Sequence, residues 1–220
     1  SILHAAAERA VPSVMELGGK SAAVVFADAD LDQLVESVYW GIFFNGGQVC
    51  SAMSRLLVER SIYDQVIERV RDLAVGLILG PGIDNCDLTP LASAGQQRQV
   101  LQHCHQAVTQ GARLVTGGAI SKSMPGYFFE PTVFCDVSTE MDLFQHEVFG
   151  PVIAITPFDT EQQAWELANG TDYGLVAGIF SKDINHCLRG IRELKAGQVF
   201  VNEWYAGGIE TPFGGTGLSG

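Results

Sequence analysis

The sequence PVIAITPFDTEQQAWELANGTDYGLVAGIFSKDINHCLRGIRELKAGQVFV, residues 151–201, decides the fold class. Short apolar runs in it predict strands, and the segments between them have the spacing of amphipathic helices. Strands are expected at 152–155, 175–180 and 199–201, and helices at 161–168 and 183–194. Strands separated by helices of about a dozen residues are joined by right-handed crossovers, which produce a parallel sheet. We therefore predict an α/β fold: an open, twisted, mostly parallel sheet with helices on both faces.

The first 150 residues add further strands and helices to this pattern. Asp30 is a candidate helix N-cap, and Gln33 three residues later completes a capping box. Ser61, with Asp64, is expected to begin another helix in the same way. The other expected elements are a helical segment at 2–10, strands at 11–17, 22–26, 55–59, 113–115 and 131–135, a long helix at 93–110 and an irregular segment at 141–150.

The composition narrows the classes of partner. The 220 residues include 13 Lys and Arg against 25 Asp and Glu, a net charge of -12. A negative protein is repelled by nucleic acid and by anionic membrane surfaces, so neither is expected as a partner. No apolar run approaches the roughly 18 residues of a membrane span. The start at Ser1 and the end at Gly220, inside a glycine-rich loop, are what we expect of a fragment.

The five cysteines are scattered and form no CxxC pair, and the N-terminus lacks the pattern of a signal peptide. Free thiols in a reducing cytoplasm are therefore expected. His103-Cys104-His105 resembles a metal-binding group, but neighbouring helical residues point in different directions. We expect no metal site. Residues 215–220 satisfy GxGxxG, yet no strand leads directly into them and no helix follows, so a dinucleotide fingerprint is not expected.

Two side chains could carry chemistry. Cys50 follows the glycine turn Asn45-Gly46-Gly47, where a small substrate could reach its thiol, although most lone cysteines are small buried hydrophobes. Glu16 comes at the end of the expected strand 11–17, where ligands bind beyond the carboxyl ends of parallel strands. Partial desolvation there would raise its pKa and suit it to general-base work. The alternative is that Glu16 only caps the strand or pairs with Lys20.

Four segments carry a resemblance that connects these residues. They are Glu16-Leu17-Gly18-Gly19-Lys20, Asn45-Gly46-Gly47-Gln48-Val49-Cys50, Glu147-Val148-Phe149-Gly150-Pro151-Val152, and Pro212-Phe213-Gly214-Gly215 with Ser219-Gly220. In this order and spacing, the chain resembles the catalytic part of the aldehyde dehydrogenase superfamily. The resemblance implies that residues 1–17 are a remnant of the cofactor-binding domain. It also implies that residues 18–220 are a catalytic domain that is incomplete at its C-terminus.

The resemblance implies a role for each matching residue. Cys50 would be the nucleophile and Glu16 the general base in the oxidation of an aldehyde to a carboxylic acid with NAD or NADP. Asn45 is expected to shape its loop rather than hold an oxyanion. The expected cofactor contacts are Glu147, Phe149, Leu17 and Gln96, and the expected substrate wall is Phe213, with Trp204 and Tyr205.

Two other classes of function stay open. One is a thiol-dependent esterase or acyl-transfer activity, which needs Cys50 and Glu16 but no nicotinamide. The other is a non-catalytic module that survives as a truncated domain. The resemblance covers only about half of a complete family member, so the isolated fragment is expected to be a weak or inactive dehydrogenase. Its parent is expected to be a homodimer or homotetramer that acts on a small-molecule aldehyde.

Overall fold

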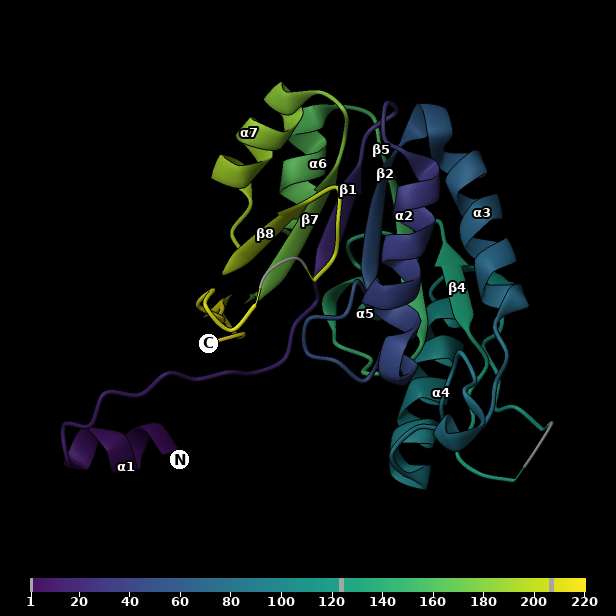
Figure 1. Ribbon diagram of the computed structural model, residues 1–220, viewed down its shortest axis with the longest axis horizontal. Coiled ribbons are helices and arrows are strands. Elements are labelled where there is room, and N and C mark those ends of the chain that lie inside the picture. The colour runs from purple at the N-terminus through teal and green to yellow at the C-terminus, as the bar shows by residue number, and fades with distance from the viewer. Residues whose placement is uncertain (1, 123–124, 206–207) are drawn as a thin grey trace.

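The computed structural model describes residues 2–122, 125–205 and 208–220, and its centre is a mixed β-sheet (Figure 1). Within the described residues the sheet has seven strands. Their order across the sheet is β3 (Arg113–Thr116), β4 (Thr132–Cys135), β5 (Val152–Phe158), β2 (Arg55–Glu59), β1 (Ala22–Val25), β7 (Val176–Phe180) and β8 (Gln198–Val201). β3 runs antiparallel to β4, and the other neighbouring pairs are parallel. The prediction of a mostly parallel α/β fold is confirmed.

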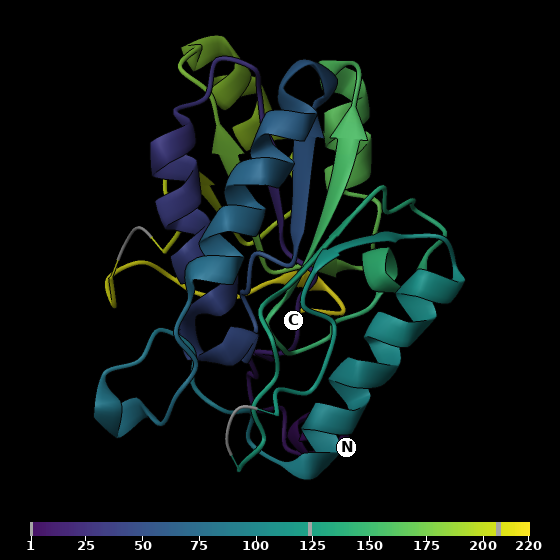
Figure 2. The same cartoon turned by 90° about the vertical axis from the view of Figure 1, so that its right-hand side faces the viewer.

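Helices cover both faces of the sheet, as predicted. On one face lie α2 (Leu31–Val38) and α3 (Tyr63–Gly76); Figure 2 shows α3, in blue, across the front of the strands. On the other face lie α4 (Ala94–Thr109), α5 (Asp142–Gln145), α6 (Glu161–Ala168) and α7 (Ile184–Glu193). Each central strand sends alternate side chains into two separate cores. In β1, Ala23 and Val25 join the first core, and Ala22 and Val24 join the second. Burial on both faces explains the continuous apolar runs of the sequence.

Of the two predicted helix starts, the one at Asp30 is correct and the one at Ser61 is wrong. Asp30 caps α2, because its Oδ1 accepts hydrogen bonds from the backbone N–H groups of Asp32 and Gln33 at 3.1 and 3.3 Å. The predicted start of α3 at Ser61 is wrong. A 3₁₀ turn (Arg60–Ile62) precedes this helix, and the Ser61 hydroxyl donates to Glu59 instead. The segment 141–150, predicted to be irregular, contains the short helix α5.

The N-terminal arm differs most from the prediction. The chain begins with α1 (Ile2–Glu8), which lies away from the sheet (Figure 1). Residues 11–17 form no strand in the described structure, and Val14 is 85% exposed. A strand requires a neighbour for its backbone N–H and C=O groups. The arm reaches the body at Leu17, whose N–H donates to the carbonyl of Ser219 at 3.1 Å.

The GxGxxG segment at 215–220 does not have the structure of a dinucleotide fingerprint. Thr216–Gly217 form the short strand β9, which pairs in antiparallel fashion with β6 (Tyr173–Gly174). Such a fingerprint lies between a parallel strand and the helix that follows it. In the described residues this segment instead closes a small two-stranded ribbon beside the main sheet.

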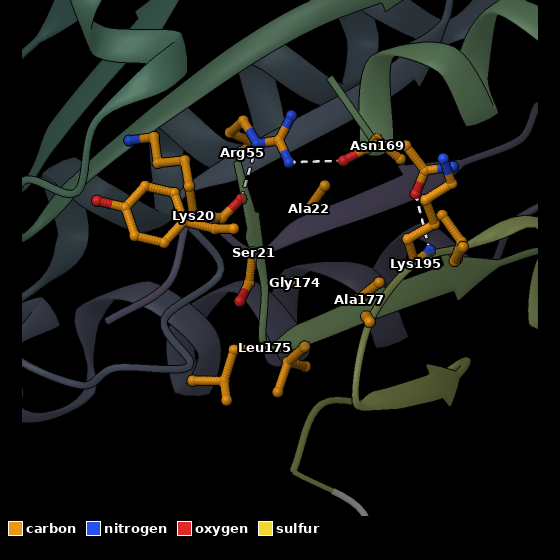
Figure 3. Close-up of a pocket in the computed structure, with 14 residues that line it drawn as sticks. Lys20, Ser21, Ala22, Arg55, Asn169, Gly174, Leu175, Ala177 and Lys195 are labelled. Atoms are coloured by element: carbon orange, nitrogen blue, oxygen red, sulfur yellow. Dashed lines mark hydrogen bonds between the residues drawn. The ribbon is translucent and has the colours of Figure 1, made fainter. Parts of the chain in front are cut away.

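A buried arginine fastens α6 to the start of the sheet. Arg55 Nε donates to the carbonyl of Lys20 at 2.8 Å (Figure 3). Its Nη1 and Nη2 donate to the carbonyls of Leu167 and Ala168, both at 2.7 Å. The guanidinium also lies over the ring of Phe144, at 4.8 Å from the centroid. Burial lowers the pKa of Arg55 to about 9. This one side chain therefore supplies the hydrogen-bond donors for three backbone carbonyls, two of them at the end of α6.

We expect Arg55→Met to destabilise the chain by about 3 kcal/mol, because it leaves three buried carbonyls without their donor. The free energy of unfolding in urea measures the effect. Arg69→Met is the matched control, because Arg69 pairs with Asp32 at the surface and its loss should cost less than about 1 kcal/mol. Equal stabilities of the two variants would contradict the role of Arg55.

Candidate active site

The candidate site lies at the amino-terminal edge of the parallel strands. Residues 16–20 lead into β1, residues 45–54 into β2 and residues 147–151 into β5. The expectation that Glu16 ends a strand at the carboxyl edge is wrong. Its segment enters β1 rather than leaving a strand, because residues 11–17 have no sheet partner. Since β1, β2 and β5 are adjacent and parallel, the three segments that precede them meet.

Cys50 and Glu16 lie within contact of each other. The thiol donates toward Glu16 Oε2 at 3.7 Å, so the two residues that the sequence singled out are brought together. Burial raises the pKa of the half-buried Cys50 thiol above its usual value, and the neighbouring Glu16 carboxylate raises it further. The backbone N–H groups of Ser51 and Cys50 oppose this shift in part. The surroundings of Cys50 therefore favour its thiol form over the thiolate.

The loop before Cys50 depends on a left-handed turn. Asn45, Gly46 and Gly47 have φ of 52°, 64° and 70°. Asn45 Nδ2 donates to the carbonyl of Gln48, and Gln48 Nε2 donates to the carbonyl of Asn45, both at 3.1 Å. A Cβ at Gly47 would overlap the carbonyl of Gly150. Asn45 thus shapes the loop, and glycine is required where the Cys50 loop touches the segment before β5.

Glu147 is held against the same edge by the second glycine pair. Its Oε1 accepts a hydrogen bond from the backbone N–H of Gly19 at 3.3 Å, and a Cβ at Gly18 would overlap its carboxylate. Burial raises the pKa of Glu147, while the Gly19 N–H and Lys20 lower it. The carboxylate is only partly buried, so it can accept further hydrogen bonds from a ligand.

Lys20 is a feature of the site that the sequence reasoning missed. Its side chain is 2% exposed, and its Nζ has no hydrogen-bond partner among the described residues. Burial and the charge of Arg55 lower its pKa to about 7, against the opposite pull of Glu147 and Asp142. The alternative that Glu16 pairs with Lys20 is wrong, because Glu16 is exposed and Lys20 is in the core. The continuous apolar run that follows Lys20 was the available signal of its burial.

The other expected cofactor contacts are Phe149, Leu17 and Gln96. Phe149 has a φ of 55° and is partly exposed, as is Leu17. Gln96 Nε2 donates to the carbonyls of Phe149 and Val148 at 2.8 and 3.1 Å. Its amide N–H₂ group is therefore used to hold the strained turn at Phe149. The contact of Gln96 with a cofactor stays a prediction, and only its Oε1 is left for it.

Phe213 and Trp204 line different hollows rather than one wall. Phe213 borders an apolar hollow of about 560 Å³, together with Phe200, Ile209 and Tyr205. Trp204 is 4% exposed and packs over Gly178 of β7, at the edge of another hollow. Tyr205 borders both hollows. That Phe213, Trp204 and Tyr205 form a substrate wall stays a prediction.

In the segment His103-Cys104-His105, which resembles a metal-binding group in sequence, His103 and Cys104 make other contacts. His103 Nδ1 lies 3.0 Å from Asp142 Oδ2, and Cys104 is buried in the core under α4. Across 2–122, 125–205 and 208–220, no group of three or more His, Cys, Asp or Glu side chains is arranged to hold a metal ion. In the same ranges, no helix is both long and apolar enough to span a membrane.

Known proteins resemble this chain over its whole length. The model of the aldehyde dehydrogenase family matches residues 1–220. A chloroplastic betaine aldehyde dehydrogenase of Beta vulgaris is 40% identical, and a peroxisomal aminoaldehyde dehydrogenase of Pisum sativum is 41% identical. Each alignment covers 100% of this chain and 44% of the relative. The chain thus spans less than half the length of these relatives, and their compartments leave its predicted cytoplasmic location untested.

Solved structures agree with the sequence matches. The structure of betaine aldehyde dehydrogenase from Staphylococcus aureus in complex with NAD+ has a TM-score of 0.95 at 37% identity, covering 99% of this chain and 44% of that one. A putative aldehyde dehydrogenase from Burkholderia cenocepacia has a TM-score of 0.94 at 44% identity, covering 100% of this chain and 47% of that one. With its sequence and its fold matched from end to end, the chain belongs to the aldehyde dehydrogenase family.

Proposed function

We propose that the protein to which this chain belongs oxidises an aldehyde to a carboxylic acid with NAD or NADP. The observation that carries the proposal is the contact of 3.7 Å between the Cys50 thiol and the Glu16 carboxylate. A nucleophile and a base within reach of each other are the two groups that covalent aldehyde oxidation requires. Membership of the aldehyde dehydrogenase family supports the reaction class.

Cys50 acts first, as the nucleophile. Its thiol first loses its proton to solvent. The thiolate then adds to the aldehyde carbon and forms a thiohemiacetal, whose oxyanion can accept a hydrogen bond from the backbone N–H of Cys50. Loss of a hydride from this adduct leaves a thioester on Cys50. Glu16 then takes a proton from water, which attacks the thioester and releases the acid with the free thiol. The position of Glu16 at the exposed end of the contact suits it to this second step.

The residues at this edge fit a nicotinamide cofactor. Glu147 presents a partly buried carboxylate to ribose hydroxyls, and Phe149 and Leu17 present exposed apolar surface beside it. NAD or NADP, when bound there, accepts the hydride. At least five of the similar solved structures are NAD+ complexes, which supports NAD as the cofactor. Gly18 keeps the space beside the Glu147 carboxylate free of a side chain.

The domain division also stays a proposal. We assign residues 1–17 to a cofactor-binding domain and residues 18–220 to the catalytic domain. The exposed arm of residues 9–17 and the position of α1 away from the sheet support this division (Figure 1). On this proposal the isolated chain is a weak or inactive dehydrogenase. The homodimer or homotetramer and the cytoplasmic location remain predictions.

A thiol-dependent esterase is the second candidate function of the isolated chain. Cys50 and Glu16 are both within the described residues and in contact, so acylation and hydrolysis need no other domain. Ester turnover without cofactor would use the same thioester chemistry as the second half of aldehyde oxidation.

We expect Cys50→Ser to abolish p-nitrophenyl acetate turnover by the chain, because a serine hydroxyl is far less ionised than a thiol at this site. The loss should be on the order of 10³-fold or more. Cys86→Ser is the matched control, since Cys86 is another half-buried free thiol. In the full-length protein, Cys50→Ser should remove aldehyde-dependent NADH production to the same extent. NADH production that survives the substitution would refute the proposed nucleophile.

Glu16→Gln should have opposite effects on two rates. Glu16 raises the pKa of Cys50, so loss of its charge should lower that pKa and speed alkylation by iodoacetamide below pH 8. The same substitution removes the base, so it should slow ester turnover by about 10²-fold. The pH profile of alkylation and the rate of ester turnover measure the two effects. Slower alkylation would instead mean that Glu16 deprotonates the thiol.

A further inference from the structure

Lys20 is a buried charged group that the proposed reaction does not use. It follows directly after the glycine pair Gly18-Gly19 at the site, and its side chain is 2% exposed. Its Nζ has no hydrogen-bond partner among the described residues. Lysine is almost never fully buried unless another charge compensates it. The charged groups around the Lys20 ammonium therefore have to account for its position.

Arg55 is the other buried cation in this region, and it does not compensate Lys20. Its guanidinium donates to three backbone carbonyls. After burial, its positive charge is the next largest cause that lowers the pKa of Lys20. In Figure 3, the Lys20 side chain points away from the guanidinium of Arg55. The compensating charge must therefore be a carboxylate on another segment.

Two carboxylates act on the Lys20 ammonium, and one of them has other partners. The negative charges of Glu147 and Asp142 oppose the lowering of the Lys20 pKa, and Glu147 has the larger effect. Asp142 has a histidine at each carboxylate oxygen, with His103 Nδ1 at 3.0 Å from Oδ2 and His146 Nδ1 at 2.6 Å from Oδ1. Glu147 is therefore the carboxylate to which Lys20 is most strongly coupled.

Glu147 lies where its own charge is disfavoured. Burial raises its pKa, and the neighbouring Glu16 carboxylate adds to that rise. The Gly19 N–H, which donates to Glu147 Oε1 at 3.3 Å, and the charge of Lys20 act in the opposite direction. Gly19 and Lys20 are adjacent in the sequence. One short segment thus fixes an oxygen of the carboxylate and supplies the positive charge that keeps it ionised.

A third segment holds the backbone of Glu147. Burial raises the pKa of Tyr173 in β6, the charge of Glu147 raises it further, and a hydrogen bond from the backbone of Glu147 opposes the rise. Tyr173 and Lys20 line the same cavity, whose volume is about 10 Å³. Such a cavity holds about one water molecule and no organic ligand. The buried ammonium therefore acts on Glu147 rather than on a ligand of its own.

We propose that Lys20 is a positioning residue that keeps the Glu147 carboxylate ionised and aligned on Gly19, ready to accept hydrogen bonds from a ribose of the nicotinamide cofactor. Without the ammonium, burial and Glu16 favour a protonated carboxyl group, which presents an O–H donor in place of an acceptor. The contact of Glu147 with the ribose rests on the proposed function. The coupling of Lys20 to Glu147 does not.

The coupling is tested on this chain by NMR titration of the isotope-labelled Glu147 carboxyl carbon and Lys20 ε-carbon. Because burial lowers the pKa of Lys20 to about 7, we expect the Glu147 signal to show a second step near that pH, at the midpoint of the Lys20 signal. A Glu147 titration without this step, or with a step at a different midpoint from that of Lys20, would overturn the coupling. This measurement requires only the wild-type chain.

Two variants assign the steps. Lys20→Met should remove the step near neutral pH and move the acidic step of Glu147 to higher pH, because the charge of Lys20 lowers the pKa of Glu147. Lys20→Arg keeps the charge, so it should restore the acidic step. Lys195→Met is the matched control, since Lys195 lines the same cavity but is exposed. Histidines also titrate near neutral pH, so a step that persists in Lys20→Met belongs to them and contradicts the proposal.

The effect on the cofactor is measured in the full-length protein by the fluorescence of bound NADH or NADPH, which requires no turnover. We expect Lys20→Met and Glu147→Gln each to weaken binding about tenfold, and Lys20→Arg to recover most of the loss. Because Lys20 acts through Glu147, the double variant should bind no more weakly than Glu147→Gln alone. Additive losses, or unchanged binding in Lys20→Met, would overturn the positioning role.

These outcomes are separate from those that test the proposed function. Unchanged cofactor binding in Lys20→Met contradicts the role of Lys20 even where Cys50→Ser abolishes aldehyde oxidation. NADH production that survives Cys50→Ser refutes the proposed nucleophile and leaves the coupling measured by NMR in place. Alkylation of Cys50 by iodoacetamide at the wild-type rate verifies that the Lys20 variants keep the site folded.

Discussion

Close approach of backbone segments at one edge of the sheet is the constraint on which the site depends. The segments that precede β1, β2 and β5 meet there, and they touch at glycine residues, which have no side chain to keep them apart. A Cβ at Gly47 would overlap Gly150, and a Cβ at Gly19 would overlap the carbonyl of Cys50. Parallel pairing makes the three segments neighbours, and glycine lets them come close enough for Cys50, Glu16 and Glu147 to share one site.

The sheet and its helices were predictable because local pattern and tertiary burial agree in them. The strands of 151–201 are apolar on both faces, as a covered parallel sheet requires, and Asp30 caps its helix as its sequence predicts. Prediction failed where an element depends on a distant partner. Residues 11–17 have the composition of a strand, but in the described structure no neighbouring strand pairs with them. Ser61 has the sequence context of an N-cap, but its hydroxyl donates a hydrogen bond to Glu59 instead.

The proposed catalytic residues were singled out from the sequence, whereas their surroundings could not be predicted from it. Cys50 and Glu16 stand in motifs of local sequence, but the edge of the sheet on which they lie is set by strand order, which no local pattern contains. Lys20 was missed for a related reason. A lysine is normally exposed, and only the fold places this side chain in the core, where the charges of Arg55, Glu147 and Asp142 act on it.

Burial and charge at this edge disfavour a free thiolate at Cys50. A carboxylate within 3.7 Å cannot stabilise a thiolate, and burial works in the same direction. Two backbone N–H groups, from Cys50 and Ser51, oppose these effects. In the proposed mechanism, the N–H of Cys50 would also donate to the oxyanion of the adduct. In that mechanism, the charge of the reacting thiolate, which Glu16 disfavours on the sulfur, passes to an oxygen that a backbone N–H can stabilise. On the proposed mechanism, the surroundings of Cys50 therefore disfavour a free thiolate more strongly than they disfavour the adduct, and Glu16 stays beside the sulfur for the hydrolysis that follows.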